Sequence, residues 1–217
     1  MRVLGIETAT DVCAVGLVDG PRDLVDLALL KPRGHGARLA GLIEAALSAA
    51  GLTTADLDAV AVSAGPGSYT GLRIGVSTAK GLCLATGASL VAVPTLEALA
   101  RSAASSRPAL AALPSRRGEI YAAVYEADGT SVCEPTALPL ADLQAWLPEA
   151  PDLVVTGPAS GAVLDAVTHR LTPIPGRPSG LTIARLGRQR AEAGHVDDVA
   201  AFEPAYLKPF VSGGGPA

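Results

Sequence analysis

A glycine-rich turn between an apolar run and a helical run constrains the fold of this chain most strongly. The turn lies in the segment Ser63-Ala-Gly-Pro-Gly-Ser-Tyr-Thr-Gly-Leu-Arg-Ile-Gly75. Residues 57–64 contain valines with alanines between them, which predicts a short buried strand, and residues 72–85 predict a helix. Gly65 and Gly67 permit backbone conformations that other residues disfavour. The sequence therefore predicts a strand, then a tight turn, and then a helix that begins directly after the turn.

The start of this predicted helix has features of an anion site. Free amide groups, the helix dipole and Arg73 in the first turn favour a negative charge. The segment nevertheless lacks the lysine of a Walker A loop and the third glycine of a dinucleotide-binding loop. A tight turn that lets the helix pack closely is the favoured interpretation, and a nucleotide or anion site remains open. Its candidate contacts are Ser68 and Thr70, either of which is suited to cap the helix, together with Tyr69 and Arg73.

Small residues recur at every fourth position in two predicted helices. In the helix predicted over residues 36–50 they are Ala37, Gly41 and Ala45, and in the next helix they are Gly71, Gly75 and Ala79. Residues with this spacing share one helix face, and small side chains let helix backbones approach each other closely. Each face either packs inside the protein on its own sheet or forms a surface for a protein partner.

The order of the predicted elements indicates the fold class. Residues 1–104 are expected to form three strands followed by helix, strand, helix, strand and helix, a ββαβαβα-type pattern of the α/β class. It matches one ribonuclease H-like lobe of the two-lobed actin, sugar-kinase and chaperone-ATPase architecture, in which two lobes flank a nucleotide cleft. We expect residues 105–211 to form a shorter, degenerate second lobe and residues 212–217 a flexible tail.

Composition excludes several classes of protein. The 49% hydrophobic content supports a real core, whereas a net charge of −4 and 3% aromatic residues argue against a generic nucleic-acid-binding protein. The longest uncharged run, residues 81–96, is too short to span a bilayer, and we expect no targeting signal and a cytoplasmic location. The cysteines and histidines are too widely spaced to predict a disulfide or a metal site.

The anchors of metal-assisted phosphoryl transfer are incomplete in this sequence. Glu7 supplies a carboxylate beside the first turn, but that turn contains no glycine. At the corresponding place in the second half, Pro114 offers neither a carboxylate nor an N–H group. A charged turn follows, and it is either a solvated hairpin edge or a ligand or partner contact; it contains Arg116, Arg117, Glu119 and Tyr121. We assign no catalytic residue.

Four segments together resemble the bacterial TsaB family, also called YeaZ. They are Ile6-Glu-Thr-Ala-Thr10, Gly65 to Gly75, Arg116-Arg-Gly-Glu-Ile-Tyr121 and Glu203-Pro-Ala-Tyr-Leu207. The resemblance covers nearly the whole chain, and it departs at Pro114-Ser-Arg116, where the family commonly has Asp-Ala-Arg. It implies the two-lobed fold and a role in forming N6-threonylcarbamoyladenosine at position 37 of tRNAs that read ANN codons.

The resemblance also implies partners. Family members look like a shortened paralogue of the catalytic subunit TsaD, pair with it through helices of the first lobe and assemble with the ATPase TsaE. Many form homodimers through the same surface. A non-catalytic scaffold is therefore expected, which contacts tRNA only through the complex and holds no cofactor when isolated; ATP or ADP at a complex interface remains open. The alternative is an independent ATP-binding enzyme of kinase-like architecture, and a third hypothesis is a protease, for which no nucleophile–base pair is found.

Overall fold

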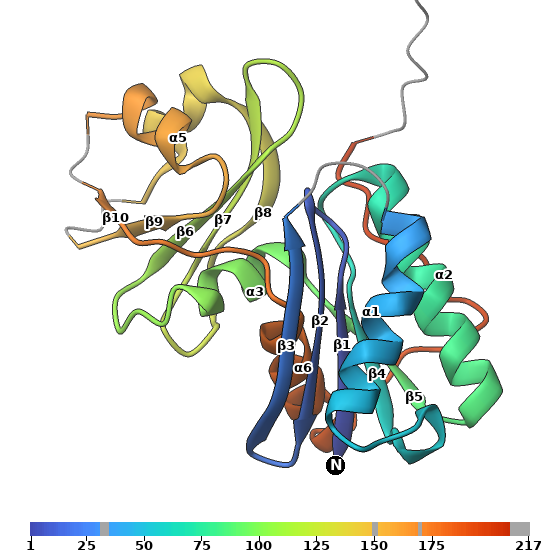
Figure 1. Ribbon diagram of the computed structural model, residues 1–217. Helices are drawn as coiled ribbons and strands as arrows, with labels where there is room; N and C mark the ends of the chain where they lie inside the picture. Colours follow the sequence, from blue (N-terminus) through green and yellow to red (C-terminus); the bar gives the residue numbers. More distant parts are fainter. Residues whose placement is uncertain (31–34, 149–151, 169–170, 209–217) are drawn as a thin grey trace, which may run out of the picture.

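Two five-stranded sheets form two lobes that lie side by side (Figure 1). The computed structural model describes residues 1–30, 35–148, 152–168 and 171–208, so the tail expected at residues 212–217 lies outside the described residues. The strand order is β3-β2-β1-β4-β5 in the first sheet and β8-β7-β6-β9-β10 in the second. Because the two orders are equivalent, the predicted two-lobed α/β architecture is confirmed.

The first lobe contains the glycine-rich turn. Its strands are β1 (Arg2–Glu7), β2 (Val12–Asp19), β3 (Arg22–Leu30), β4 (Ala59–Ser63) and β5 (Ser89–Val93). Strands β1 to β3 pair antiparallel, whereas β4 and β5 run parallel to β1. Helices α1 (His35–Ala49) and α2 (Tyr69–Thr86) cover one face of this sheet, and the short helix η1 (Thr54–Asp56) precedes β4 (Figure 1). Every residue of β4 is buried, as expected for a strand covered on both faces.

The second lobe repeats the arrangement with shorter elements. Its strands are β6 (Ala109–Pro114), β7 (Glu119–Tyr125), β8 (Ser131–Pro139), β9 (Val154–Thr156) and β10 (Thr172–Pro173). Its helices are η2 (Leu140–Asp142), α4 (Leu143–Trp146) and α5 (Ser160–Ala166). Strands β9 and β10 have only 3 and 2 residues, against 5 in each of β4 and β5. In the described ranges of the chain, no helix is long and apolar enough to cross a membrane.

The last helix of each half packs on the sheet of the other half. Helix α3 (Thr95–Ser102) follows β5 but packs Leu96 and Leu99 against the second sheet. Helix α6 (Gly180–Glu192) follows β10 but packs Ile183 and Ala184 on the first sheet, on the face opposite α1 and α2 (Figure 1). The packing therefore differs from the expected division at residues 104 and 105. The physical reason is that an apolar helix face does not specify which sheet it will cover.

Helix α6 lies directly on the backbone of β1 and β2. A Cβ atom added to Gly5 would collide with the carbonyl oxygen of Gly180, and one added to Gly16 would collide with the amide of Leu181. Glycine on both surfaces removes the side chains that would otherwise keep the helix away from the sheet. The contact therefore requires glycine, and it fixes the height of α6 above the sheet.

We expect Gly5→Ala to lower the free energy of unfolding by about 3 kcal/mol or more, because the added methyl group has only backbone to displace. The matched control is Gly81→Ala in α2, where an added Cβ would meet no described atom within 4 Å. That variant should gain roughly 0.5–1 kcal/mol from helix propensity. Urea denaturation measures both, and equal stabilities for the two variants would contradict the assigned contact.

Candidate functional site

The glycine-rich turn packs against the turn that follows β1. A Cβ atom on Gly67 would collide with the carbonyl oxygen of Ala9, and one on Gly71 would collide with that of Thr8. The amide of Ser68 donates to the Ala9 carbonyl at 2.7 Å, and Thr8 Oγ1 donates to the Gly71 carbonyl at 2.8 Å. The backbone of the first turn therefore occupies the space beside the glycines. Close packing, the favoured interpretation of this segment, explains the glycines.

The side chains at the start of α2 are used within the protein. Ser68 caps the helix as predicted, because its Oγ accepts the N–H of Gly71 at 3.2 Å, while Thr70 is exposed. Arg73 is also exposed, and it lies against Tyr69: its Nη1 donates to the tyrosine hydroxyl at 2.9 Å, and its guanidinium carbon lies 5.3 Å from the ring centroid. Capping and ring packing therefore account for these groups without a ligand.

The two sets of small residues have different surroundings. The α2 residues are buried, and a Cβ atom on Gly75 would collide with Thr8 Oγ1. The expectation that Gly71, Gly75 and Ala79 form a partner surface is therefore corrected, since they form the inner face of α2. A large residue at Gly75 would disrupt the lobe rather than test an interface. The α1 residues Ala37, Gly41 and Ala45 are all exposed.

The Glu7 carboxyl group is completely buried at the end of β1. Its Oε1 accepts the Ala9 N–H at 2.7 Å, and among the described residues its Oε2 has no hydrogen-bond partner. Burial raises the pKa of Glu7 to about 7, although hydrogen bonds from the Ala9 amide, the Ser63 side chain and the Thr10 amide lower it. An enclosed carboxyl group cannot contact a nucleotide or an anion in solvent. The expected ligand contact at Glu7 is therefore corrected.

A cavity of about 300 Å³ lies between the two lobes. Asp11 and Ser68 line it from the first lobe, and Arg116 and Tyr121 line it from the second lobe. Arg117 is exposed beside Arg116 in the turn before β7. The structure thus brings Ser68, Arg116 and Tyr121 together, and it leaves Glu7 and Arg73 outside the lining.

The cavity lacks two of the usual anchors for the phosphates of a nucleotide. On the side of the first lobe, the backbone of Thr8 and Ala9 fills the space beside the glycines. On the side of the second lobe, Pro114 lines the cavity without an N–H group or a carboxylate. In the part of the chain that the structure describes, no group of three or more His, Cys, Asp and Glu side chains could hold a metal ion.

The segment Glu203–Leu207 covers the glycine-rich turn, a contact that the sequence did not reveal. The Ala205 amide donates to the Ala64 carbonyl at 2.8 Å, and the rings of Tyr206 and Tyr69 lie 4.9 Å apart. Just beyond it, Lys208 pairs with Glu119 of the second lobe. The Glu-Pro-Ala-Tyr-Leu motif was the sequence signal for this segment, but the motif does not indicate which part of the protein the segment contacts.

The chain is similar to proteins of tRNA modification. Residues 30–186 match a family model described as TsaD, tRNA N6-adenosine threonylcarbamoyltransferase. The tRNA threonylcarbamoyladenosine biosynthesis protein TsaB of Escherichia coli is 36% identical over 135 residues, which are 61% of this chain and 58% of that protein. An uncharacterized protein of Mycobacterium tuberculosis is 34% identical over 95% of this chain and 91% of its own length. The solved structure of YeaZ from Pseudomonas aeruginosa has a TM-score of 0.83 at 24% identity, covering 95% of this chain and 99% of that chain.

Glu7 should make stability depend on pH. Its carboxyl group loses its proton near pH 4.5 when the chain is unfolded and only near pH 7 when it is folded, so the unfolded chain binds fewer protons between these values. Stability then falls as the pH rises. We expect the wild-type protein to lose roughly 2–3 kcal/mol more than Glu7→Gln between pH 5 and pH 8 in urea denaturation. Parallel pH profiles for the two proteins would contradict the buried, protonated carboxyl group.

Proposed function

The chain belongs to the TsaB (YeaZ) family, and we propose that it is a non-catalytic partner subunit in the formation of N6-threonylcarbamoyladenosine in tRNA. It binds and activates a TsaD-like catalytic paralogue, which modifies position 37 of ANN-decoding tRNAs, and it contacts tRNA only through the complex. The names of the matched family model and of the Escherichia coli relative support the pathway. The glycine-rich turn, filled by the protein's own backbone, supports the non-catalytic role.

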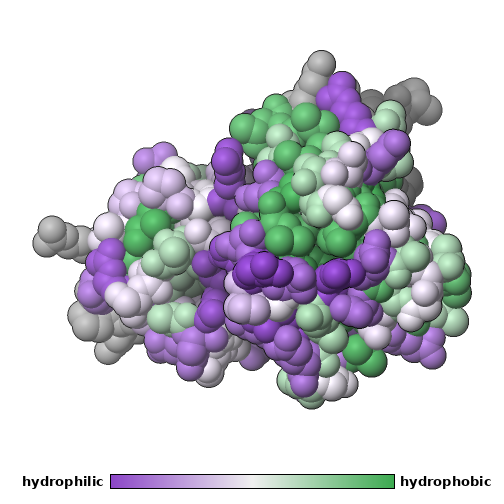
Figure 2. Space-filling model, turned by 60° about the horizontal axis from the view of Figure 1, so that its bottom comes forward, coloured by the Kyte–Doolittle hydropathy of each residue, from purple (hydrophilic) through white to green (hydrophobic). Residues whose placement is uncertain are grey.

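The surface of α1 is the observation that carries this proposal. The exposed Ala37, Gly41 and Ala45 leave a smooth stripe on the helix, and an apolar groove of about 510 Å³ lies beside it between α1 and α2, lined by Leu47 and Leu82 among others. Figure 2 shows a broad hydrophobic area with hydrophilic residues along its border. An apolar centre with a polar rim is the usual anatomy of a protein–protein interface.

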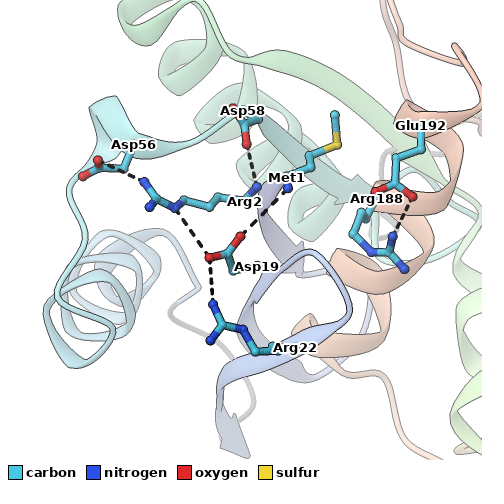
Figure 3. Close-up of polar contacts among 8 residues, drawn as sticks. All are labelled: Met1, Arg2, Asp19, Arg22, Asp56, Asp58, Arg188 and Glu192. Atoms are coloured by element: carbon cyan, nitrogen blue, oxygen red, sulfur yellow. Dashed lines mark hydrogen bonds and ion pairs between the residues drawn. The ribbon is translucent and has the colours of Figure 1, made fainter.

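Ion pairs connect one side of this groove, formed around η1, to the rest of the first lobe. The groove is lined in part by Thr53 and Thr54, at the start of η1. Arg2 pairs with Asp56 of η1 at 3.3 Å and with Asp19 at 3.8 Å, which ties η1 to the β1–β2 hairpin (Figure 3). These side chains are 30–40% exposed, so the pairs add little to stability.

The same surface is the site that we propose for pairing with the TsaD-like paralogue and, in the isolated chain, for a homodimer. A TsaE-like ATPase completes the complex in this proposal. ATP or ADP then binds at an interface between subunits rather than in the turns of this chain, where the backbone of Thr8 and Ala9 leaves no room beside the glycines.

The variant Gly41→Arg tests the surface. A Cβ atom at Gly41 meets no described atom within 4 Å, so the fold should survive, whereas a charged side chain in an apolar contact must lose its hydration. We expect binding to a purified TsaD-like paralogue from the same cell to weaken by about 100-fold or more in calorimetry. In cells that depend on this chain, the threonylcarbamoyladenosine content of tRNA, measured by mass spectrometry, should fall.

The matched control is Gly161→Arg. Gly161 is also an exposed helical glycine with open space around it, but it lies in α5 of the second lobe. This variant should keep both binding and modification. Normal binding by folded Gly41→Arg would remove α1 from the interface. Unchanged modified tRNA in cells that lack the chain altogether would overturn the proposed function.

A further inference from the structure

We propose that residues 193–208, which we name the strap, couple the position of the second lobe to the glycine-rich turn at the start of α2. The strap is the segment that follows α6. The inference goes beyond the proposed function, because it concerns a movement within the isolated chain and does not depend on which partner binds.

The strap passes around the edge of the first sheet. It begins at the end of α6, on one face, and crosses the edge strand β5, where the Asp197 amide donates to the Leu90 carbonyl at 2.9 Å. It then reaches α2 on the opposite face, where Lys80 Nζ donates to two strap carbonyls, including that of Phe202 at 3.0 Å. Phe202 also packs against the core of the first lobe. The strap is therefore firmly attached to the first lobe.

The end of the strap packs against the glycine-rich turn. The Ala205 amide bonds to the Ala64 carbonyl at 2.8 Å, and Gly65 has no side chain to hold Ala205 away. The ring of Tyr206 then packs against the ring of Tyr69, and the guanidinium group of Arg73 lies over the same Tyr69 ring. The arrangement of Tyr69 and Arg73 at the start of α2 thus depends on the strap being in place.

The strap contacts the second lobe through Lys208, its last residue. Lys208 pairs with Glu119, the first residue of β7, and the two side chains are 18% and 29% exposed. Tyr206 lies only two residues earlier, a distance of roughly 7 Å along an extended chain. If β7 moves away from the first lobe, either the ion pair breaks or Tyr206 is drawn off Tyr69.

This position also relates the strap to the cavity between the lobes. Ser68, the neighbour of Tyr69, lines the cavity from the first lobe, and Tyr121, two residues after Glu119, lines it from the second. The strap therefore connects the two sides of the cavity. Widening the cavity strains the Lys208–Glu119 pair first, because a partly exposed ion pair is weaker than the backbone contacts and ring packing that hold the strap to the first lobe.

Amide hydrogen exchange of the isolated full chain tests this coupling. In Glu119→Gln and in Lys208→Gln we expect the amides of Ala205, Gly65 and residues 67–73 to exchange roughly fivefold faster than in the wild-type protein, since one surface ion pair is lost. The double variant Glu119→Lys with Lys208→Glu reverses the pair and should restore slow exchange. Circular dichroism confirms that each variant is folded.

The matched control is Asp152→Asn, which removes the Arg107–Asp152 pair within the second lobe. It should leave exchange at Ala205, at Gly65 and at residues 67–73 unchanged. The proposal is overturned if the single variants exchange like the wild-type protein, or if the control accelerates exchange at the same amides. Because no partner is present in the assay, these outcomes are independent of the result for Gly41→Arg.

Discussion

Contact between backbone segments at the start of α2 is the constraint on which the first lobe depends. Three stretches that are far apart in the sequence meet there, and each meeting point has a glycine opposite a carbonyl oxygen: Gly67 faces Ala9, Gly71 faces Thr8, and Gly65 faces the strap. Any side chain at these positions would separate the stretches. The burial of Glu7 is a consequence, because the turn closed over it leaves its carboxyl group without solvent and raises its pKa.

The exchange of α3 and α6 joins the two lobes at a second place. Each helix belongs by sequence to one half and by packing to the other, and Arg190 of α6 pairs with Glu97 of α3 where the two helices meet. The chain thus crosses between the lobes through two packed helices. The strap contacts the second lobe elsewhere, through Glu119 at the start of β7. The two lobes are therefore joined at separate places, by the packed helices and by the strap.

Local signals predicted much of the fold, and long-range contacts explain what they missed. The strand predicted within residues 57–64 and the Ser68 cap depend on neighbouring residues, so the sequence was sufficient for both. Gly41 and Gly75 have the same four-residue pattern, yet one is exposed and the other buried. Whether a helical glycine is buried depends on the segment that packs against that face of the helix, and the spacing of residues along the helix does not reveal it. The pairing of Lys208 with Glu119 joins residues 89 positions apart, beyond the reach of any pattern.

Two backbone amides of the glycine-rich turn are bonded within the protein. In a phosphate-binding loop, free backbone amides at a helix start meet the anion. Here the Ser68 amide already donates to Ala9, and the Gly71 amide donates to Ser68 Oγ. These two donors are therefore already used by the protein, and the bond from Ser68 ties the start of α2 to the turn after β1. A turn packed in this way fixes the start of α2 by contacts within the protein, and α2 forms one side of the groove beside α1.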